Sequence, residues 1–425
     1  MSGRMKFMTA TVVLAVAALL PAMGANVRSI VDPDLYVVQY DPGTGLEDYI
    51  GPMTASSSVT VDTSVDPPTM TVDATTTYYG EVVTSEPYES ATVNLAVFSF
   101  TGDVTIESGV HINLNEKGAG HLGFVLASRG NLTLDGTLTA NGGVGGTSTS
   151  RYTGSAGGMS GAGAWNDGGE AVAYPNEDNS EYQSGRGGRL AGSGIRTAGG
   201  GGYGGVGDSA SAGGGPSYGT LDMDLLNGGS GGGGAVDQHG TAGGGGAGGA
   251  IELVALGALE VNGTVRANGA RGNAANNNTK EGYSGGGSGG GILLAGATID
   301  LSDAEIYANG GDGIGFWNTD VSWYNSGAGG GGRIAFYVGN IWSASSFETQ
   351  DCDTGGNGEM DNVTTVTGLT PPGTLSNVSV TRGSFVRSDN KNTKGSSYMP
   401  SNNSAHGSIY AVYVLPPAGT VIVVR

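Results

Sequence analysis

The chain of 425 residues contains 84 glycines and one cysteine, and its 38 acidic and 18 basic residues give a formal net charge of −20 at pH 7. A charge of this sign disfavours binding to nucleic acid or to anionic membrane surfaces, so we expect no nucleic-acid partner. A single cysteine excludes an intrachain disulfide.

Residues 1–24 are predicted to be a secretory signal peptide. Arg4 and Lys6 precede an apolar run over residues 7–20, and Ala22-Met23-Gly24 places small residues at a cleavage site. The apolar run spans about 14 residues, whereas a membrane-spanning helix needs about 20, so a membrane anchor is the disfavoured alternative. We expect a secreted, extracellular or cell-surface protein with no transmembrane anchor in the mature chain.

Residues 25–95 are predicted to form a Thr/Ser-rich N-terminal β extension. Apolar and polar residues alternate over 58–62 and 69–73, and this period in β-branched residues is typical of strands. Pro67 and Pro68 stand between the two stretches, which favours an edge strand or a linker there.

A repeat of about 41 residues dominates the next region, residues 96–340. Three segments that begin with Gly-Gly place Ile251, Ile292 and Ile334 at spacings of 41 and 42 residues. A fixed period in this range is typical of stacked arrays, in which each unit buries its apolar face against its neighbours. We predict an all-β chain built as a parallel β-solenoid, a β-helix-like stack with inward Ile, Leu and Val side chains.

The copies of this repeat share the sequence Ala-Asn-Gly, which places Asn141, Asn268 and Asn309 at equivalent positions. Asparagine tolerates unusual backbone angles and hydrogen-bonds through its side chain. We predict that these three residues are structural turn residues whose side chains can form a ladder.

Residues 142–247 form a Gly-rich insertion within the repeat region. Two packed arrangements fit this composition: tight turns stacked along the solenoid, or extended polyglycine II-like segments that pair through their backbones because no Cβ intervenes. A flexible loop is the third interpretation, since glycine is costly to order. After the repeat region, residues 341–425 are predicted to form a small C-terminal β element or cap.

Three stretches within about 96–340 carry a resemblance to a known group of proteins. They are VTIESGVHINL followed by GNLTLDGTLTANGGVGG, then GGAIELVALGALEVNGTVRANG, and finally GAGGGGRIAFY. In the spacing of glycines and strands they resemble exported, Gly-rich bacterial surface proteins with β-helix-like repeats. The resemblance implies an extracellular location, often within larger adhesin-like or polysaccharide-associated chains, and no shared catalytic residues. This chain is short and lacks an LPxTG sorting motif, which departs from that group.

Enzymatic and metal chemistry find little support in the sequence. The four histidines have no metal-ligand spacing, and we predict no catalytic residue and no required cofactor. Ca²⁺ is the one metal considered, because two stretches approach the Gly-Gly-x-Gly-x-Asp pattern of calcium-binding repeats with the Asp displaced by one position. The candidate Ca²⁺ ligands are Asp312, Asp351 and Asp353, and ordinary solvated acids are the alternative.

Four aromatic residues are the candidate ligand-binding site. Phe316, Trp317, Trp323 and Tyr324 stand close together in a polar stretch, residues 313–327. Flat aromatic faces beside Asn and Asp side chains suit the recognition of sugars. The alternative is that these side chains fold back onto the stack.

Together these features favour a non-enzymatic structural or adhesive protein of the cell surface or extracellular matrix, with carbohydrates or other surface proteins as partners. A secreted polysaccharide-binding or polysaccharide-degrading β-helix protein is the first alternative. An ice-binding solenoid is the second, because Thr133, Thr137 and Thr139 hint at a flat threonine face, although Arg266 and Tyr307 interrupt it.

Overall fold

The computed structural model describes residues 30–34, 38–40, 47–48, 51–84, 94–114, 122–150, 155–162, 164, 167–168, 170, 198–208, 213–220, 223, 226–237, 240–275, 282–317, 323–342, 347–353, 356–360, 366, 368–371, 375–387 and 404–414. The predicted signal peptide, residues 1–24, lies outside the described residues.

The described part of the chain is all-β without a helix, as predicted, and most of its strand pairs are parallel. Its largest sheet has eight strands, of which the outermost two run antiparallel to their neighbours. In spatial order they are β26 (Glu348–Asp351), β31 (Ser408–Tyr413), β25 (Arg333–Val338), β20 (Gly291–Gly296), β17 (Ala250–Ala255), β11 (Gly123–Ser128), β8 (Asn94–Phe100) and β7 (Glu81–Thr84).

Two six-stranded sheets consist of shorter strands. The first is parallel throughout: β28 (Leu369–Thr370), β21 (Thr298–Asp300), β18 (Ala258–Val261), β12 (Leu132–Leu134), β9 (Val104–Ile106) and β3 (Met53–Ala55). The second contains β10 (His111–Asn113), β13 (Thr137–Thr139), β19 (Thr264–Arg266), β22 (Glu305–Tyr307) and β29 (Leu375–Ser379), with β27 (Glu359–Met360) antiparallel at its end.

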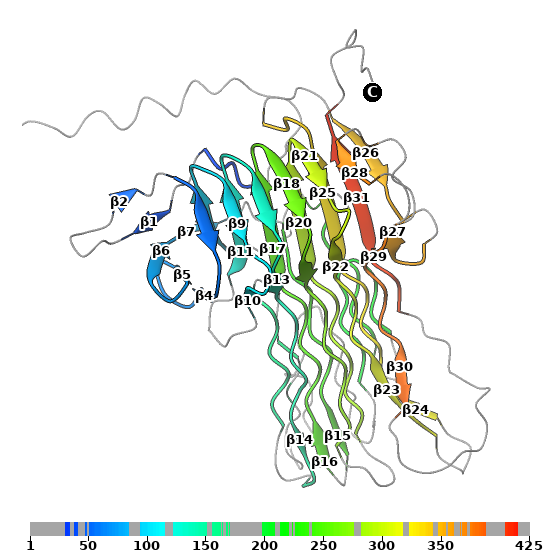
Figure 1. Cartoon of the computed structure of the whole chain (residues 1–425). Helices are drawn as coiled ribbons and strands as arrows, with labels where there is room; N and C mark the ends of the chain where they lie inside the picture. The colour runs from blue at the N-terminus through cyan, green and yellow to red at the C-terminus, as the bar shows by residue number, and fades with distance from the viewer. Residues whose placement is uncertain are drawn as a thin grey trace, which may run out of the picture.

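Consecutive strands along the chain enter these three sheets in rotation. β8, β9 and β10 lie in three different sheets, and so do β11, β12 and β13, then β17, β18 and β19, and then β20, β21 and β22. Beyond residue 340, β28, β29 and β31 pair in parallel with β21, β22 and β25, so the C-terminal region also extends all three sheets. Figure 1 shows these strands side by side, largely in chain order, with β26 and β27 beyond β31 and β29 at the C-terminal end.

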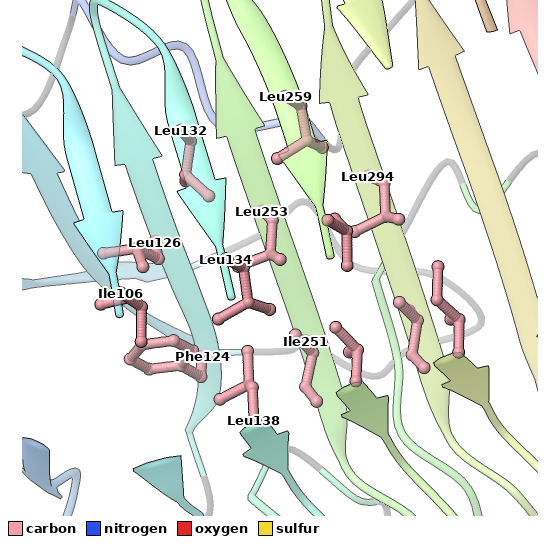
Figure 2. Packing of buried hydrophobic residues seen from close by; sticks show 14 of the residues in the cluster. Ile106, Phe124, Leu126, Leu132, Leu134, Leu138, Ile251, Leu253, Leu259 and Leu294 are labelled. Atoms are coloured by element: carbon pink, nitrogen blue, oxygen red, sulfur yellow. The ribbon is translucent and has the colours of Figure 1, made fainter. Parts of the chain in front are cut away.

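The register of the largest sheet follows the repeat read from the sequence. Ile251 is the direct partner of Ile292, which is the partner of Ile334. These side chains belong to one apolar core with leucines of the two six-stranded sheets, such as Leu134, Leu138 and Leu259. Figure 2 shows side chains such as Leu126, Leu134 and Leu259 in the space between the strands of different sheets. Strands of the six-stranded sheets alternate buried and more exposed residues. This period of two residues is typical of a sheet that has one face in the core and the other exposed to solvent.

The eight-stranded sheet is buried on its outer face as well, so its inner strands are buried at every position. Ile30 and Val31 of the N-terminal segment and Met223 and Leu226 of the insertion join an outer apolar cluster on this sheet. The N-terminal segment is also bonded to the sheet, because Ser99 Oγ donates to the Pro33 carbonyl at 3.0 Å. We call residues 30–34 the N-terminal strap.

The N-terminal β extension contains an antiparallel five-stranded sheet. Its strands are β2 (Glu47–Asp48), β1 (Gln39–Tyr40), β6 (Thr76–Tyr79), β5 (Thr69–Val72) and β4 (Val59–Asp62). The alternation at 58–62 and 69–73 thus corresponds to paired strands. β3 from the same region joins the first six-stranded sheet beside β9.

Glycine-rich segments leave the parallel sheets and run together to a far end of the molecule (Figure 1). We call them the glycine bundle, defined by the described segments 140–147, 155–162, 199–208, 228–234, 243–249, 267–272, 284–290, 308–312 and 327–332. Two small sheets lie along the bundle toward that end (Figure 1). They are β14 (Thr147–Ser148), β16 (Gly240–Ala242) and β15 (Ala235–Asp237), and β24 (Trp323–Asn325), β23 (Gly313–Trp317) and β30 (Phe385–Arg387).

Candidate binding site at the end of the glycine bundle

Backbone hydrogen bonds hold the glycine bundle together, and in segment 284–290 their direction rotates along the chain. In segment 284–290 the N–H groups donate to three neighbouring segments in turn, and the sequence of acceptors repeats every three residues. Gly285 donates to Gly233, Gly286 to Gly327, Gly287 to Ala270, Ser288 to Ser230, Gly289 to Gly330 and Gly290 to Ala267, at 2.7–3.0 Å. A period of three residues is that of an extended, polyproline II-type helix.

The carbonyl groups of the same segment accept hydrogen bonds from three further segments. The donors are Gly245 and Gly248 from one segment, Gly201 from a second and Gly311 from a third. Segment 284–290 therefore has six hydrogen-bonded neighbours. This density explains the composition, because a Cβ added to Gly287 would overlap the backbone of Gly246.

The three asparagines of the repeat form a ladder where the bundle leaves the sheets. Asn141 Oδ1 accepts the N–H of Asn268 at 2.8 Å, and Asn268 Oδ1 accepts the N–H of Asn309 at 2.7 Å. Asn309 Oδ1 in turn accepts the N–H of Thr381 at 2.7 Å. None of the three asparagines has a positive φ. The ladder therefore uses the asparagine side chain and does not use the unusual backbone angles that we also considered.

Asp312 occupies the next position of this pattern, three residues after Asn309. Its Oδ1 accepts the N–H and the hydroxyl of Ser384 at 2.7 and 2.8 Å, and Ser384 itself lies three residues after Thr381. The carboxylate of Asp312 thus links two neighbouring segments in the way that the Asn309 amide does.

The other two candidate Ca²⁺ ligands also engage backbone groups. Asp351 Oδ1 accepts the Asp353 N–H at 3.0 Å. The Asp353 carboxylate accepts the N–H groups of Asn357 and Gly358 at 3.1 and 2.9 Å. In the part of the chain that the structure describes, no three His, Cys, Asp or Glu side chains gather as a metal-binding group. Binding of Ca²⁺ by these acids stays a prediction.

The four candidate aromatic residues lie on one antiparallel hairpin, β23–β24. Phe316 is the partner of Tyr324, and Trp317 is the partner of Trp323. The other side of β23 pairs in parallel with β30, so the hairpin belongs to a small sheet. This sheet lies along the bundle, away from the large parallel sheets (Figure 1). The hairpin thus brings two neighbouring dipeptides, 316–317 and 323–324, into two adjacent cross-strand pairs.

The faces of the six-stranded sheets carry polar columns, including the threonines considered for ice binding. Thr105 of β9 lies between Thr54 and Thr133, but the partner of Thr133 on the next strand is Glu260. On the second sheet, Thr139 has Arg266 as its partner. The described threonine columns therefore end after two or three strands.

Sequence reasoning missed a surface cluster on this second sheet. Arg266 forms an ion pair of 3.0 Å with Glu305 and lies over the ring of Tyr307 at 5.5 Å from its centroid. Partial burial and the Glu305 charge raise the pKa of Tyr307, and Arg266 opposes that rise. A 41-residue period places these side chains on neighbouring strands, and that period was the available signal for this cluster.

It also missed two buried ionisable groups on the outer face of the eight-stranded sheet. Glu252 is fully buried, one of its carboxyl oxygens accepts the Val31 N–H at 2.8 Å, and the other has no partner. Burial raises the pKa of Glu252 to about 8, and the Val31 hydrogen bond opposes that rise. Arg333 is buried against the Tyr203 ring and donates to the Tyr218 carbonyl at 2.9 Å.

Comparison with known proteins yields no match for this chain among protein families, curated proteins or solved structures. Within the described residues, no helix has the length and apolar character that crossing a membrane requires.

Proposed function

We propose that this chain is a non-enzymatic structural and adhesive protein of the extracellular space or cell surface. In this proposal the parallel sheets are the walls of a β-solenoid, the glycine bundle is a polyglycine II-like stalk, and residues at the far end of the stalk recognise a surface carbohydrate.

The solenoid is supported by the order in which strands enter the sheets. Consecutive strands visit three sheets in rotation and return to pair in register with the preceding visit. A chain that does so coils around the apolar core between the sheets, and each coil buries its inward residues against its neighbours.

The stalk is supported by the three-residue rotation of hydrogen bonds in segment 284–290 and by its six neighbours. An extended three-residue helix without side chains can pack at this density and satisfy its backbone groups. Because each segment is tied to several others, the bundle is suited to hold its far end at a fixed distance from the sheets.

The adhesive role rests on the aromatic hairpin, which is the single observation that carries it. Phe316, Trp317, Trp323 and Tyr324 occupy two adjacent cross-strand pairs on a sheet along the stalk. Aromatic residues on adjacent strands are suited to stack against sugar rings.

The experiment is a glycan-array screen of the chain without residues 1–24, compared with a variant in which Phe316, Trp317, Trp323 and Tyr324 are all changed to Ala. We expect glycan binding by the wild-type chain and loss of that binding in the variant. A matched control changes Tyr307 and Tyr410 to Ala, which removes aromatic rings from the large sheets and leaves the hairpin intact.

Three further readouts separate the alternatives. Circular dichroism of the variants checks that both fold. EDTA added to the array tests Ca²⁺, since loss of binding on chelation would assign a role to the candidate acids. Release of reducing ends from a bound polysaccharide would contradict the non-enzymatic assignment, and a wild-type chain that binds no glycan would remove the adhesive part of the proposal.

A further inference from the structure

Among the residues that the structure describes, one lateral edge of the glycine bundle has fewer hydrogen-bonded neighbours than the interior. Residues 141–147 and 155–161, the first of which leads to β14 (Figure 1), form what we call the bundle edge. Hydrogen bonds of segment 141–147 join it to the segments of Asn268, Met159 and Gly246. The interior segment 284–290 has twice as many hydrogen-bonded neighbours.

On both segments of the bundle edge, residues three positions apart are exposed. Val144 and Thr147 are exposed on one segment, and Ala156 and Met159 are exposed on the adjacent one. Val144 is 49% exposed and Met159 37%, and both are among the few large apolar side chains exposed in the described part of the chain. The Gly143 N–H donates to the Met159 carbonyl, so the two side chains belong to neighbouring positions. The edge therefore presents a small apolar patch.

Two glycines of the edge have room for a Cβ, in contrast with the glycines behind them. A Cβ added to Gly143 or Gly146 would come no closer than 3.4 Å to any other segment. A Cβ added to Gly145 or Gly158 would overlap the backbone of a neighbouring segment. The bundle is thus closely packed around Gly145 and Gly158, whereas Gly143 and Gly146 can accept a side chain without overlap.

The charge distribution favours a contact between copies at this place. The whole chain has 38 acidic residues, but residues 141–164 contain none and have Arg151 as their one charged residue. Two molecules with a net charge of −20 repel each other over most of their surface. An uncharged edge lowers that cost where apolar residues are also available for burial.

We propose that the bundle edge is an interface with a second copy of this chain, in which the glycine-rich edges of two stalks pack side by side. The second copy supplies a surface of the required kind, with an uncharged edge and the exposed apolar side chains of Val144 and Met159. Contact of the same patch on both partners gives a closed two-fold dimer. The inference is independent of the proposed carbohydrate binding.

The test is the mass of the chain without residues 1–24 in solution, measured by sedimentation velocity over a concentration series. The wild-type chain is expected to dimerise, and the double variant Val144→Asp, Met159→Asp is expected to raise the dimer dissociation constant at least tenfold. The control is Val65→Asp, Val82→Asp, which adds the same charge at two other sites that are each 42% exposed, and it should dimerise as the wild type does.

A second measurement locates the contact without altering the apolar side chains. The native Cys352 is buried, so Gly143→Cys introduces one accessible thiol at a position with room for a side chain. A short bis-maleimide should cross-link this variant as a dimer and leave Val65→Cys monomeric on a denaturing gel. A wild-type chain that stays monomeric, a dimer that the Asp substitutions at Val144 and Met159 leave unchanged, or a dimer that cross-links only through Val65→Cys would overturn the proposal.

Discussion

The sheet-forming part of the chain and the glycine bundle satisfy the same backbone groups by opposite means. In the sheets, strands lie about 4.8 Å apart and large side chains fill the space between the sheets. Ile251, Ile292 and Ile334 stack there in register. In the bundle, backbones approach from all sides, and a Cβ at Gly287 would overlap Gly246. The sheets therefore depend on large side chains that fill the core. The bundle depends on glycines, whose lack of a Cβ lets the backbones come close.

This contrast predicts that the sheets respond most strongly to the removal of side-chain atoms. Leu253 is fully buried on β17, between Leu126 and Leu294 on the adjacent strands. Leu253→Ala should lower the free energy of unfolding by about 2 to 5 kcal/mol, because it removes apolar contact and leaves a cavity. Urea denaturation measures the loss. The exposed Val82→Ala is the control and should change stability by less than about 0.5 kcal/mol.

The outer layer of the sheets should make stability depend on pH. Burial raises the pKa of Glu252 from 4.5 to about 8, so the folded chain holds a proton that the unfolded chain releases. The stabilising contribution is complete below the unfolded value and is lost as pH rises through the folded value. Between pH 6 and pH 9 the loss should be on the order of 3 kcal/mol.

Glu252→Gln removes this titration and keeps an acceptor for the Val31 N–H. Thermal melts of the variant should therefore vary less with pH than those of the wild type, and the variant should be the more stable protein at pH 9. Equal pH profiles for the two proteins would mean that Glu252 does not hold its proton in the fold.

Adding a methyl group to a glycine of the bundle should raise or lower the free energy of unfolding, depending on the position of that glycine. Gly287→Ala places a methyl group against the Gly246 backbone and should cost about 1 to 3 kcal/mol. Gly143→Ala meets its nearest neighbour at 3.4 Å and should be neutral or stabilising by up to about 1 kcal/mol, because it restricts the unfolded chain. Chemical denaturation of both variants checks the pair, and equal destabilisation of the two would contradict the close packing of the interior.

The sequence predicted the sheets better than the bundle because their signals differ in kind. The 41-residue period of apolar residues appears directly as the register of Ile251 and Ile292. In a run of glycines, no side chain marks which neighbour each N–H will choose. Ser384, the partner of Asp312, lies 72 residues away in a region without the repeat. Ile409 is the direct partner of Ile334, but no Gly-Gly pair precedes it, so the sequence repeat did not predict this pairing.

The candidate site was predictable in its residue types and not in its geometry. The cluster of aromatic residues at 316–324 was visible in the sequence, whereas the pairing of Phe316 with Tyr324 depends on the hairpin register. The burial of Glu252 could not be predicted from the residues around it, because it depends on the N-terminal strap more than 200 residues earlier in the chain.

The three-residue rotation also limits how this molecule can change in size. An insertion of one or two residues in a glycine segment would turn every later N–H toward the wrong neighbour, whereas an insertion of three restores the pattern. Since neighbouring segments are bonded along their length, they must lengthen together. The distance from the sheets to the far end of the bundle can therefore increase in evolution only in steps of about 9 Å. This is the rise of three residues in such a helix.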